Sequence, residues 1–374
     1  MIEIIPVQYY VRVFYVTLFV ISLITGLYYN NSNTQKYLLN HYSIALPFLL
    51  TILLTIFLGL RPASWTFGDM MMYNHRWNVI EVSSNEVHYD FNKEWFFTYV
   101  LNTCKIFFTN GQYWFLVVEI FYIGCQFWSC KRLLWENVWM AILFVFFSYQ
   151  FFTFGTNGIR NGMGTALMML SISFFCDRNN VGYIVGFLLF LLAMGCHRSV
   201  MIPMAALMTS LFVIKDIKKA VAVWLVCIFL SFFFGQFFVN FFAGLGFDDR
   251  MNSYATDSER ESTMSGFSHS GFRWDFLLYS AMPVWLAWYV EYKGIKDKTF
   301  TLLANTYIIA NSFWVLVCRV SFSNRFAYLS WFMYALVIAY AVIRVPIWND
   351  QDRKAGRILI AHSAFTMIMW VLGK

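Results

Sequence analysis

The sequence predicts an all-α, polytopic integral membrane protein with about twelve transmembrane helices. Two observations carry this prediction: the composition and the length of the apolar runs. The chain has 374 residues, of which 60% are hydrophobic and 13% charged, whereas a soluble domain has about 25% charged residues. Apolar runs of about 17–23 residues recur throughout, enough to cross a hydrocarbon core of roughly 30 Å as helices that satisfy their own backbone hydrogen bonds.

The expected spans run from one end of the chain to the other. They are 7–29, 41–60, 112–130, 133–153, 158–176, 181–196, 199–214, 220–242, 274–290, 300–318, 325–343 and 357–372. Segment 95–109 is shorter and contains Lys105, so we expect a helix that lies at the interface or re-enters the membrane. Residues 1–374 are expected to form a single transmembrane domain, with 61–111 and 243–273 as extracytoplasmic loops.

Charge distribution predicts the orientation. Nine of the 12 lysines fall on one side of the expected spans, and ten of the 15 arginines fall on the other. The lysine-rich side is assigned to the cytoplasm by the positive-inside rule, which turns both termini outward. The orientation of the N-terminus depends on whether 95–109 crosses the membrane.

The arginines on the outer side suggest an anion site. Arginine is preferred over lysine where phosphate or carboxylate is bound in a planar, bidentate way. Several of these arginines stand at helix ends or within spans: Arg61, Arg160, Arg198, Arg273, Arg319 and Arg325. The alternative is that they are membrane-interface anchors or ion-pair partners of Glu119, Asp69 and Asp275.

Four motifs, in order along residues 58–331, resemble those of the EpsG-like, Wzy-type polysaccharide polymerases. LGLRPASWTFGDMMMY at 58–73 resembles their G-L-R…G-x-D…Y element, and GIRNGMGTALMMLSISFF at 158–175 resembles a helix start in that family. MGCHRSVMIP at 194–203 and SNRFAYLSW at 323–331 resemble two later elements.

The resemblance implies an architecture, a reaction and partners. It implies a GT-C-like, lipid-dependent glycosyltransferase of the bacterial inner membrane, which polymerises repeat units of surface polysaccharide such as O-antigen or capsule. The substrates would be glycans linked to undecaprenyl pyrophosphate, and the partners a flippase and a chain-length regulator. The sugars, the linkage and the stereochemical outcome stay open, and no nucleic acid is expected.

Residue roles follow from that reaction. Arginines would stabilise the charge that develops on the departing pyrophosphate, and no metal or other cofactor is expected. The acceptor hydroxyl needs a base, for which His197 and Asp69 are the candidates; the alternatives are a helix-end histidine and a capping aspartate. Supporting residues are Glu119, Asp275, Tyr73 and His269, the last in a loop that could close as a lid.

Other functions stay open at this stage. A flippase for the same lipid-linked unit would bind pyrophosphate too, but it should show two similar halves, which are not visible. A sugar acyltransferase should place its histidine near the cytoplasmic side. A ligase shares the donor chemistry, and the sequence does not separate it from a polymerase.

Overall fold

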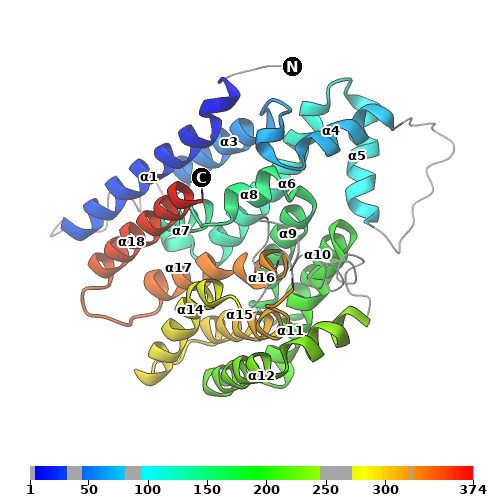
Figure 1. The fold of residues 1–374 in the computed structure, drawn as a ribbon. Coiled ribbons are helices and arrows are strands. Elements are labelled where there is room, and N and C mark those ends of the chain that lie inside the picture. The colour runs from blue at the N-terminus through cyan, green and yellow to red at the C-terminus, as the bar shows by residue number, and fades with distance from the viewer. Residues whose placement is uncertain (1–4, 32–43, 81–93, 245–271, 321–322, 374) are drawn as a thin grey trace. The chain divides into compact units, whose positions relative to one another are not determined.

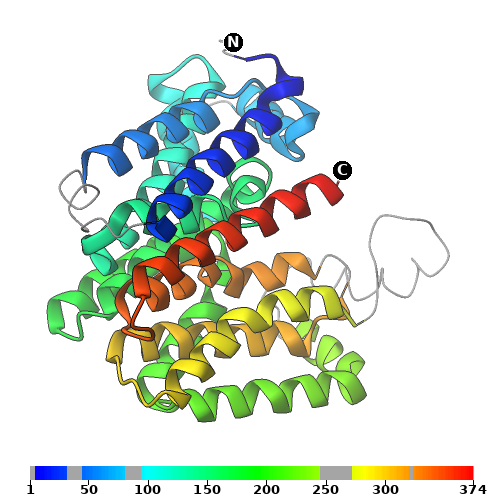
Figure 2. The same cartoon turned by 90° about the vertical axis from the view of Figure 1, so that its left-hand side faces the viewer.

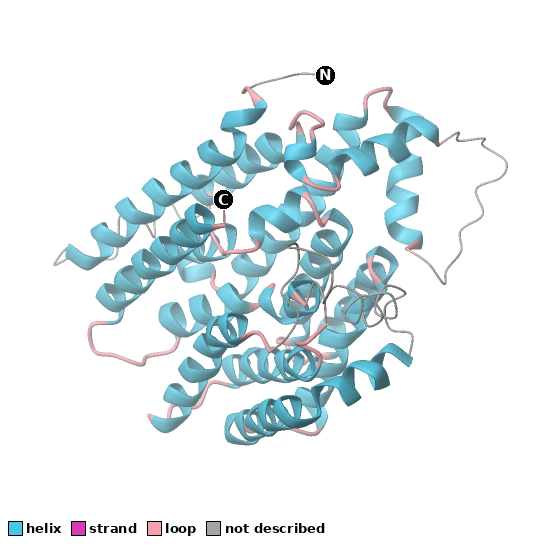
Figure 3. Ribbon diagram, viewed as in Figure 1, coloured by secondary structure: helices cyan, strands magenta, loops and turns pink. Residues whose placement is uncertain are grey.

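The computed structural model describes residues 5–31, 44–80, 94–244, 272–320 and 323–373. Within these ranges the chain folds into helices and their connections, with no strand (Figures 1 and 3). The all-α prediction is therefore confirmed for the described part of the protein. The second loop predicted from sequence, 243–273, lies largely outside these residues. His269, within that loop, lies outside them as well.

Helices account for most of the described residues. In chain order they are α1 (Val7–Asn31), α3 (Ala45–Gly59), α4 (Met70–Val79), α5 (Trp95–Phe107), α6 (Gly111–Leu133), α7 (Val138–Phe146), α8 (Phe151–Thr156), α9 (Ile159–Phe175), α10 (Asn180–Cys196), α11 (Met201–Phe212), α12 (Ile217–Gly244), α14 (Trp274–Tyr292), α15 (Lys298–Leu316), α16 (Asn324–Trp331), α17 (Tyr334–Arg344) and α18 (Gln351–Leu372). Short 3₁₀ turns lie at Trp65–Phe67, Trp135–Asn137 and Arg198–Val200.

Several helices have the length and apolar character of membrane spans, so the chain is a multi-pass membrane protein. Among the described residues, six helical segments meet both criteria: Val7–Asn31, Gly111–Leu133, Ile217–Phe242, Lys298–Leu316, Asn324–Arg344 and Gln351–Leu372. Four further apolar helices have 10–17 residues. The count of twelve crossings and the GT-C-like architecture stay predictions.

Two of the expected spans are interrupted. The run 133–153 becomes α7, which ends at Phe146, and α8, which begins at Phe151. Two turns separate them, with the Ser148 amide donating to the Val145 carbonyl and the Phe151 amide to that of Ser148. The run 325–343 is similarly divided between α16 and α17.

Contacts divide the chain into two compact units, and unit 1 comprises residues 1–197 and 342–374. Helix α9 lies at its centre and packs against α6, α8 and α10, while α6 also contacts α3 and α5. The first and last helices, α1 and α18, lie side by side (Figure 2). They meet where Gly26 faces Gly356, and a Cβ on Gly26 would stand 2.8 Å from the Gly356 carbonyl oxygen. Such small residues permit close helix contact in membranes.

Unit 2 comprises residues 198–341, and α15 is its central helix. Helices α11, α12, α14 and α16 all pack against α15. Asn311 on α15 joins two of them: its Oδ1 accepts from Trp224 Nε1 of α12 at 2.8 Å, and its Nδ2 donates to Ser330 Oγ of α16 at 2.9 Å. Interhelical hydrogen bonds of this kind hold apolar helices in register.

Candidate functional site

Arg160, in the first turn of α9, is the centre of a polar cluster in unit 1. Its Nε donates to Tyr73 Oη at 3.1 Å, and its Nη1 forms an ion pair with Glu94 Oε2. The side chains of Arg160 and Glu94 are 20% and 23% exposed. The third nitrogen, Nη2, makes no hydrogen bond within the described residues. Arg160 therefore keeps donors for a ligand.

A fixed turn places Tyr73 in this cluster. Gly68 has a φ of 61°, and a Cβ there would stand 2.5 Å from the side chain of Asn157. The same Asn157 Oδ1 accepts a hydrogen bond from the Asp69 amide at 2.8 Å. Asn157, the C-cap residue of α8, thus holds the start of α4. Asp69 occupies the N-cap position of α4, and Tyr73 follows one turn later on the same face.

Tyr73 contributes a hydroxyl with a proton to donate. Burial raises the pKa of Tyr73, and the nearby Arg160 guanidinium partly offsets that effect. The phenol therefore stays protonated at neutral pH. Its oxygen accepts from Arg160, so the O–H remains available to a phosphate or sugar oxygen. Asp69, half-buried, is close enough to Tyr73 to act on it electrostatically.

His197 lies beside the same helix. It is the half-buried C-cap residue of α10, and a Cβ on Gly164 would stand 3.5 Å from His197 Cβ. Gly164 is one turn from Arg160 on the same face of α9. The structure thus brings the two predicted base candidates, His197 and Asp69, to the same end of α9 as Arg160, although from different helices.

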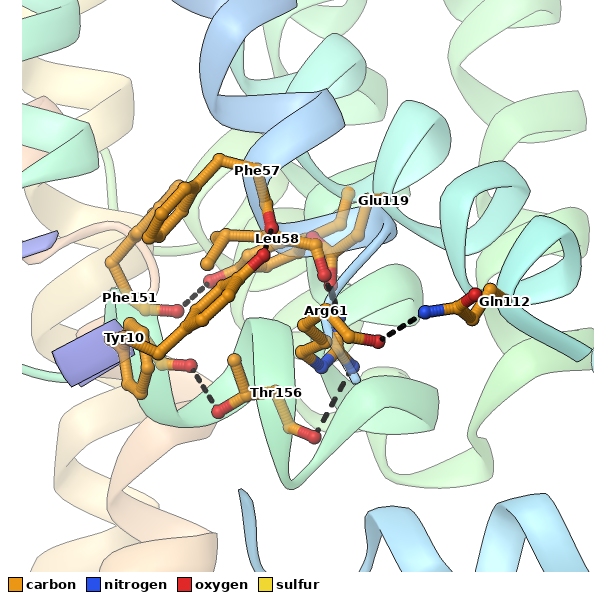
Figure 4. A network of polar contacts seen from close by, with 10 residues as sticks. Tyr10, Phe57, Leu58, Arg61, Gln112, Glu119, Phe151 and Thr156 are labelled. Atoms are coloured by element: carbon orange, nitrogen blue, oxygen red, sulfur yellow. Dashed lines mark hydrogen bonds and ion pairs between the residues drawn. The ribbon is translucent and has the colours of Figure 1, made fainter. Parts of the chain in front are cut away.

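Arg61 occupies a different environment, inside the protein. Its Nη1 pairs with Glu119 Oε1 at 2.9 Å, and the two side chains are 0% and 1% exposed. Nη1 also donates to the Leu58 carbonyl, and Nη2 donates to the Thr156 carbonyl at 3.3 Å. Figure 4 shows this arrangement. The guanidinium is therefore enclosed by the protein, and Glu119 has the ion-pairing role that the sequence offered as an alternative.

Further hydrogen bonds fix the segment around Arg61 (Figure 4). Gln112 of α6 donates to the Leu60 carbonyl at 3.2 Å. Figure 4 shows its second bond, to the Arg61 carbonyl at 3.4 Å, and the bond from Tyr10 of α1 to the Phe57 carbonyl at 2.7 Å. These bonds satisfy the carbonyl groups at the end of α3, which have no partner within the helix. Arg61 and its neighbours consequently join α1, α3, α6 and α8 at the point where the chain turns toward Asp69.

Two of the predicted arginines of unit 2, Arg319 and Arg273, lie near Phe232 of α12. Arg319 Nη2 donates to the Phe232 carbonyl at 2.9 Å, beside the kink at Phe234 of α12. The Phe232 ring contacts Phe272 and Trp274, the residues on either side of Arg273, with centroid separations of 6.0 and 6.3 Å.

The remaining predicted residues of unit 2 have individual settings. Arg273 pairs with Asp275 through contacts of 2.9 and 2.6 Å and stacks over the Phe276 ring. Asp275 therefore has an ion-pairing role that the sequence left open. Arg325 is half-buried in the first turn of α16, and Arg198 is exposed in the 3₁₀ turn before α11.

Sequence reasoning missed Glu94 and Asn157. Glu94 is 66 residues from Arg160 along the chain, so no local pattern reveals the pairing. Asn157 does stand three residues before Arg160, and asparagine next to glycine at a helix start could have marked it as a residue that fixes a turn. Among the described residues, no group of three or more His, Cys, Asp or Glu side chains is placed to hold a metal ion.

Comparison with known proteins gives one result. The model of the EpsG family matches residues 44–373. This range includes every candidate residue described above and begins after α1. No curated protein and no solved structure gives a significant match to the chain.

Proposed function

The chain belongs to the EpsG family, and from this premise we propose that it polymerises oligosaccharide repeat units carried on undecaprenyl pyrophosphate. The reaction takes place at the outer face of the bacterial inner membrane. The growing glycan is transferred from its lipid pyrophosphate to a hydroxyl of an incoming unit. A flippase supplies the units, and a chain-length regulator acts with the polymerase.

One observation supports this proposal above the others: Arg160 offers unused donors beside a protonated Tyr73 hydroxyl. As the bond between the anomeric carbon and the pyrophosphate breaks, negative charge grows on the departing oxygen. A guanidinium positioned beside the departing oxygen stabilises that charge. Arg160 binds the pyrophosphate in this way, and Tyr73 donates a hydrogen bond to it or to the sugar.

Arg61 acts at a distance. Its guanidinium is enclosed by Glu119 and by backbone carbonyls, so we assign it to positioning the turn that leads to Asp69 and Tyr73, in place of direct contact with phosphate. Arg198, Arg273, Arg319 and Arg325 belong to unit 2, and their role as pyrophosphate ligands stays a prediction from the sequence. His197 and Asp69 keep theirs as candidates for accepting the acceptor proton.

The experiment supplies the purified protein in liposomes with a lipid-linked repeat unit. A ladder of products supports a polymerase. Transfer of one glycan to a different acceptor favours a ligase, and movement of the unit between leaflets without a product favours a flippase. Either of the latter results overturns the proposal.

Arginine replacements locate the anion site. Arg160→Ala and Arg198→Ala are each expected to slow elongation about 10²–10³-fold, the loss typical of removing one donor to a developing oxyanion. The matched control is Arg132→Ala, because Arg132 pairs with Asp177 just beyond the other end of α9, with a contact of 2.6 Å. Normal elongation by both Arg160→Ala and Arg198→Ala would remove the anion site from the proposal.

A further inference from the structure

Glu94 is a carboxylate in the Arg160 cluster to which neither the sequence motifs nor the family match gives a role. It occupies the N-cap position of α5. An acidic residue there commonly accepts a hydrogen bond from its own helix. The Glu94 side chain makes no such bond and reaches Arg160 of α9 instead. Its carboxylate is thus directed into the site.

The ion pair leaves part of this carboxylate available. Oε2 contacts Arg160, and no contact of Oε1 is found within the described residues. The Glu94 side chain is 23% exposed, so a ligand can reach it. The pair is part-buried, so it is open to a competing ligand, and a pyrophosphate carries more negative charge than one carboxylate. A multiply charged anion can therefore displace Glu94 from Arg160.

We propose that Glu94 is the general base of glycosyl transfer and that Arg160 restrains it until the lipid pyrophosphate binds. This inference rests on the proposed function. The pyrophosphate binds the Arg160 guanidinium in place of Glu94. The Glu94 carboxylate is then unpaired beside the reacting sugar. The same arginine then controls the leaving group and the base.

The step balances without any further reactant. The acceptor hydroxyl oxygen forms a bond to the anomeric carbon of the donor glycan, and its proton passes to a Glu94 oxygen. The bond between that carbon and the pyrophosphate oxygen breaks, and its electron pair leaves with the pyrophosphate, which Arg160 stabilises. The proton on Glu94 returns to water after the product departs.

This mechanism couples donor binding to release of the base, two events that are independent at a simple anion site. With the donor absent, Glu94 is paired and attracts no proton from a bound acceptor or from water. With the donor present, the base is released next to the activated sugar. A donor analogue should therefore compete with Glu94 for Arg160.

Two measurements on the full-length protein test the inference. The first is the elongation rate with the lipid-linked unit, and the second is the affinity for inorganic pyrophosphate as a probe of Arg160. Glu94→Gln is expected to slow elongation about 10²–10⁴-fold, the usual contribution of a general base. It should also bind pyrophosphate up to about fivefold more tightly, because a competing charge has been removed.

Controls separate a base from a structural residue. Glu136→Gln changes a glutamate that also contacts an arginine, Arg344, at 3.6 Å in the same unit, and it should elongate normally. Glu94→Asp should retain part of the rate. Azide should partly restore Glu94→Ala, because a small anion can replace a missing base but cannot replace a lost packing contact. Asp69→Asn and His197→Gln, measured alongside, show which base the reaction needs.

The outcomes distinguish the two proposals. If the wild-type protein makes no ladder, the proposed function fails and this inference falls with it. If the wild type makes a ladder and Glu94→Gln elongates within about threefold of it, only the inference is wrong. Weaker pyrophosphate binding by Glu94→Gln would also overturn it, because that result would make Glu94 a support for Arg160.

Discussion

Two of the arginine–glutamate pairs of unit 1, Arg61–Glu119 and Arg160–Glu94, differ in their access to solvent. Arg61 and Glu119 are fully buried, and the Arg61 guanidinium is bonded to backbone carbonyls as well as to the carboxylate. Arg160 and Glu94 are partly exposed, and Arg160 shares only its Nε and Nη1 with the protein.

The comparison shows that burial determines what a guanidinium can do. A buried charge needs an opposite charge beside it, because an unpaired one is very costly to remove from water; Arg61 and Glu119 supply this to each other, although Arg61 Nε and Glu119 Oε2 have no hydrogen-bond partner among the described residues. An arginine at the edge of the protein can hold a carboxylate loosely and exchange it for a ligand. The same two residue types can therefore stabilise a turn in one place and form a binding site in another.

The largest effect is expected from a substitution that breaks the buried Arg61–Glu119 pair. Glu119→Ala leaves Arg61 charged and enclosed, so we expect the free energy of unfolding to fall by about 3–5 kcal/mol. Glu94→Ala should change it by less than about 1 kcal/mol, because that pair is partly exposed. Denaturant titration of the detergent-solubilised protein measures both. Similar losses in the two variants would show that the contrast in burial has no energetic consequence.

A double replacement sharpens the same contrast. Arg61→Met with Glu119→Leu removes both charges and keeps much of the volume, so most of the stability should return. If elongation returns as well, Arg61 has no contact with phosphate. If stability returns and elongation does not, Arg61 itself takes part in the reaction and the positioning role is wrong.

An intermediate effect is expected at the turn that joins the two pairs. Gly68→Ala places a residue with a Cβ at a positive φ, and that Cβ would overlap with the Asn157 side chain. We expect a loss of about 1–3 kcal/mol of stability and slower elongation, because Tyr73 would move away from Arg160. The control is Gly124→Ala, where a Cβ meets nothing within 4 Å. Equal behaviour of the two variants would show that the turn does not position Tyr73.

The smallest effect is expected at Tyr73, which lies beside the partly exposed Arg160–Glu94 pair. Tyr73→Phe removes the acceptor for Arg160 Nε and the O–H that could reach the substrate. A hydrogen bond from a neutral hydroxyl to a sugar oxygen contributes about 0.5–1.5 kcal/mol, so elongation should slow roughly tenfold or less. Tyr9→Phe, in the exposed part of α1, serves as the control. An unaltered rate would exclude Tyr73 from the site.

The sequence predicted the helices well, because hydropathy records burial in lipid or protein. The limits of α6 and α10 agree closely with the expected spans. It missed the breaks after Phe146 and after Trp331. The break after Trp331 lies within an apolar stretch, and hydropathy changes little where a buried chain turns. The break after Phe146 contains Ser148 and Gln150, two polar residues too few to interrupt the apolar run around them.

The candidate site was only partly predictable for a related reason. Arg160, Tyr73, Asp69 and His197 stand in motifs, so the sequence singled them out, but the depth of each side chain is set by tertiary packing. Arg61 and Arg160 therefore looked alike, although one is buried and the other is not. Glu94 has no motif of its own, and only the fold reveals its pairing with Arg160.

The pairing of α1 with α18 has a consequence for the order in which the protein is assembled. Unit 1 consists of residues 1–197 and 342–374, with the whole of unit 2 between them. During synthesis α1 is translated long before α18. The surface of α1 around Gly26 therefore cannot pack against α18 until Gly356 has been translated. Unit 1 therefore cannot be completed before the whole of unit 2 has been translated.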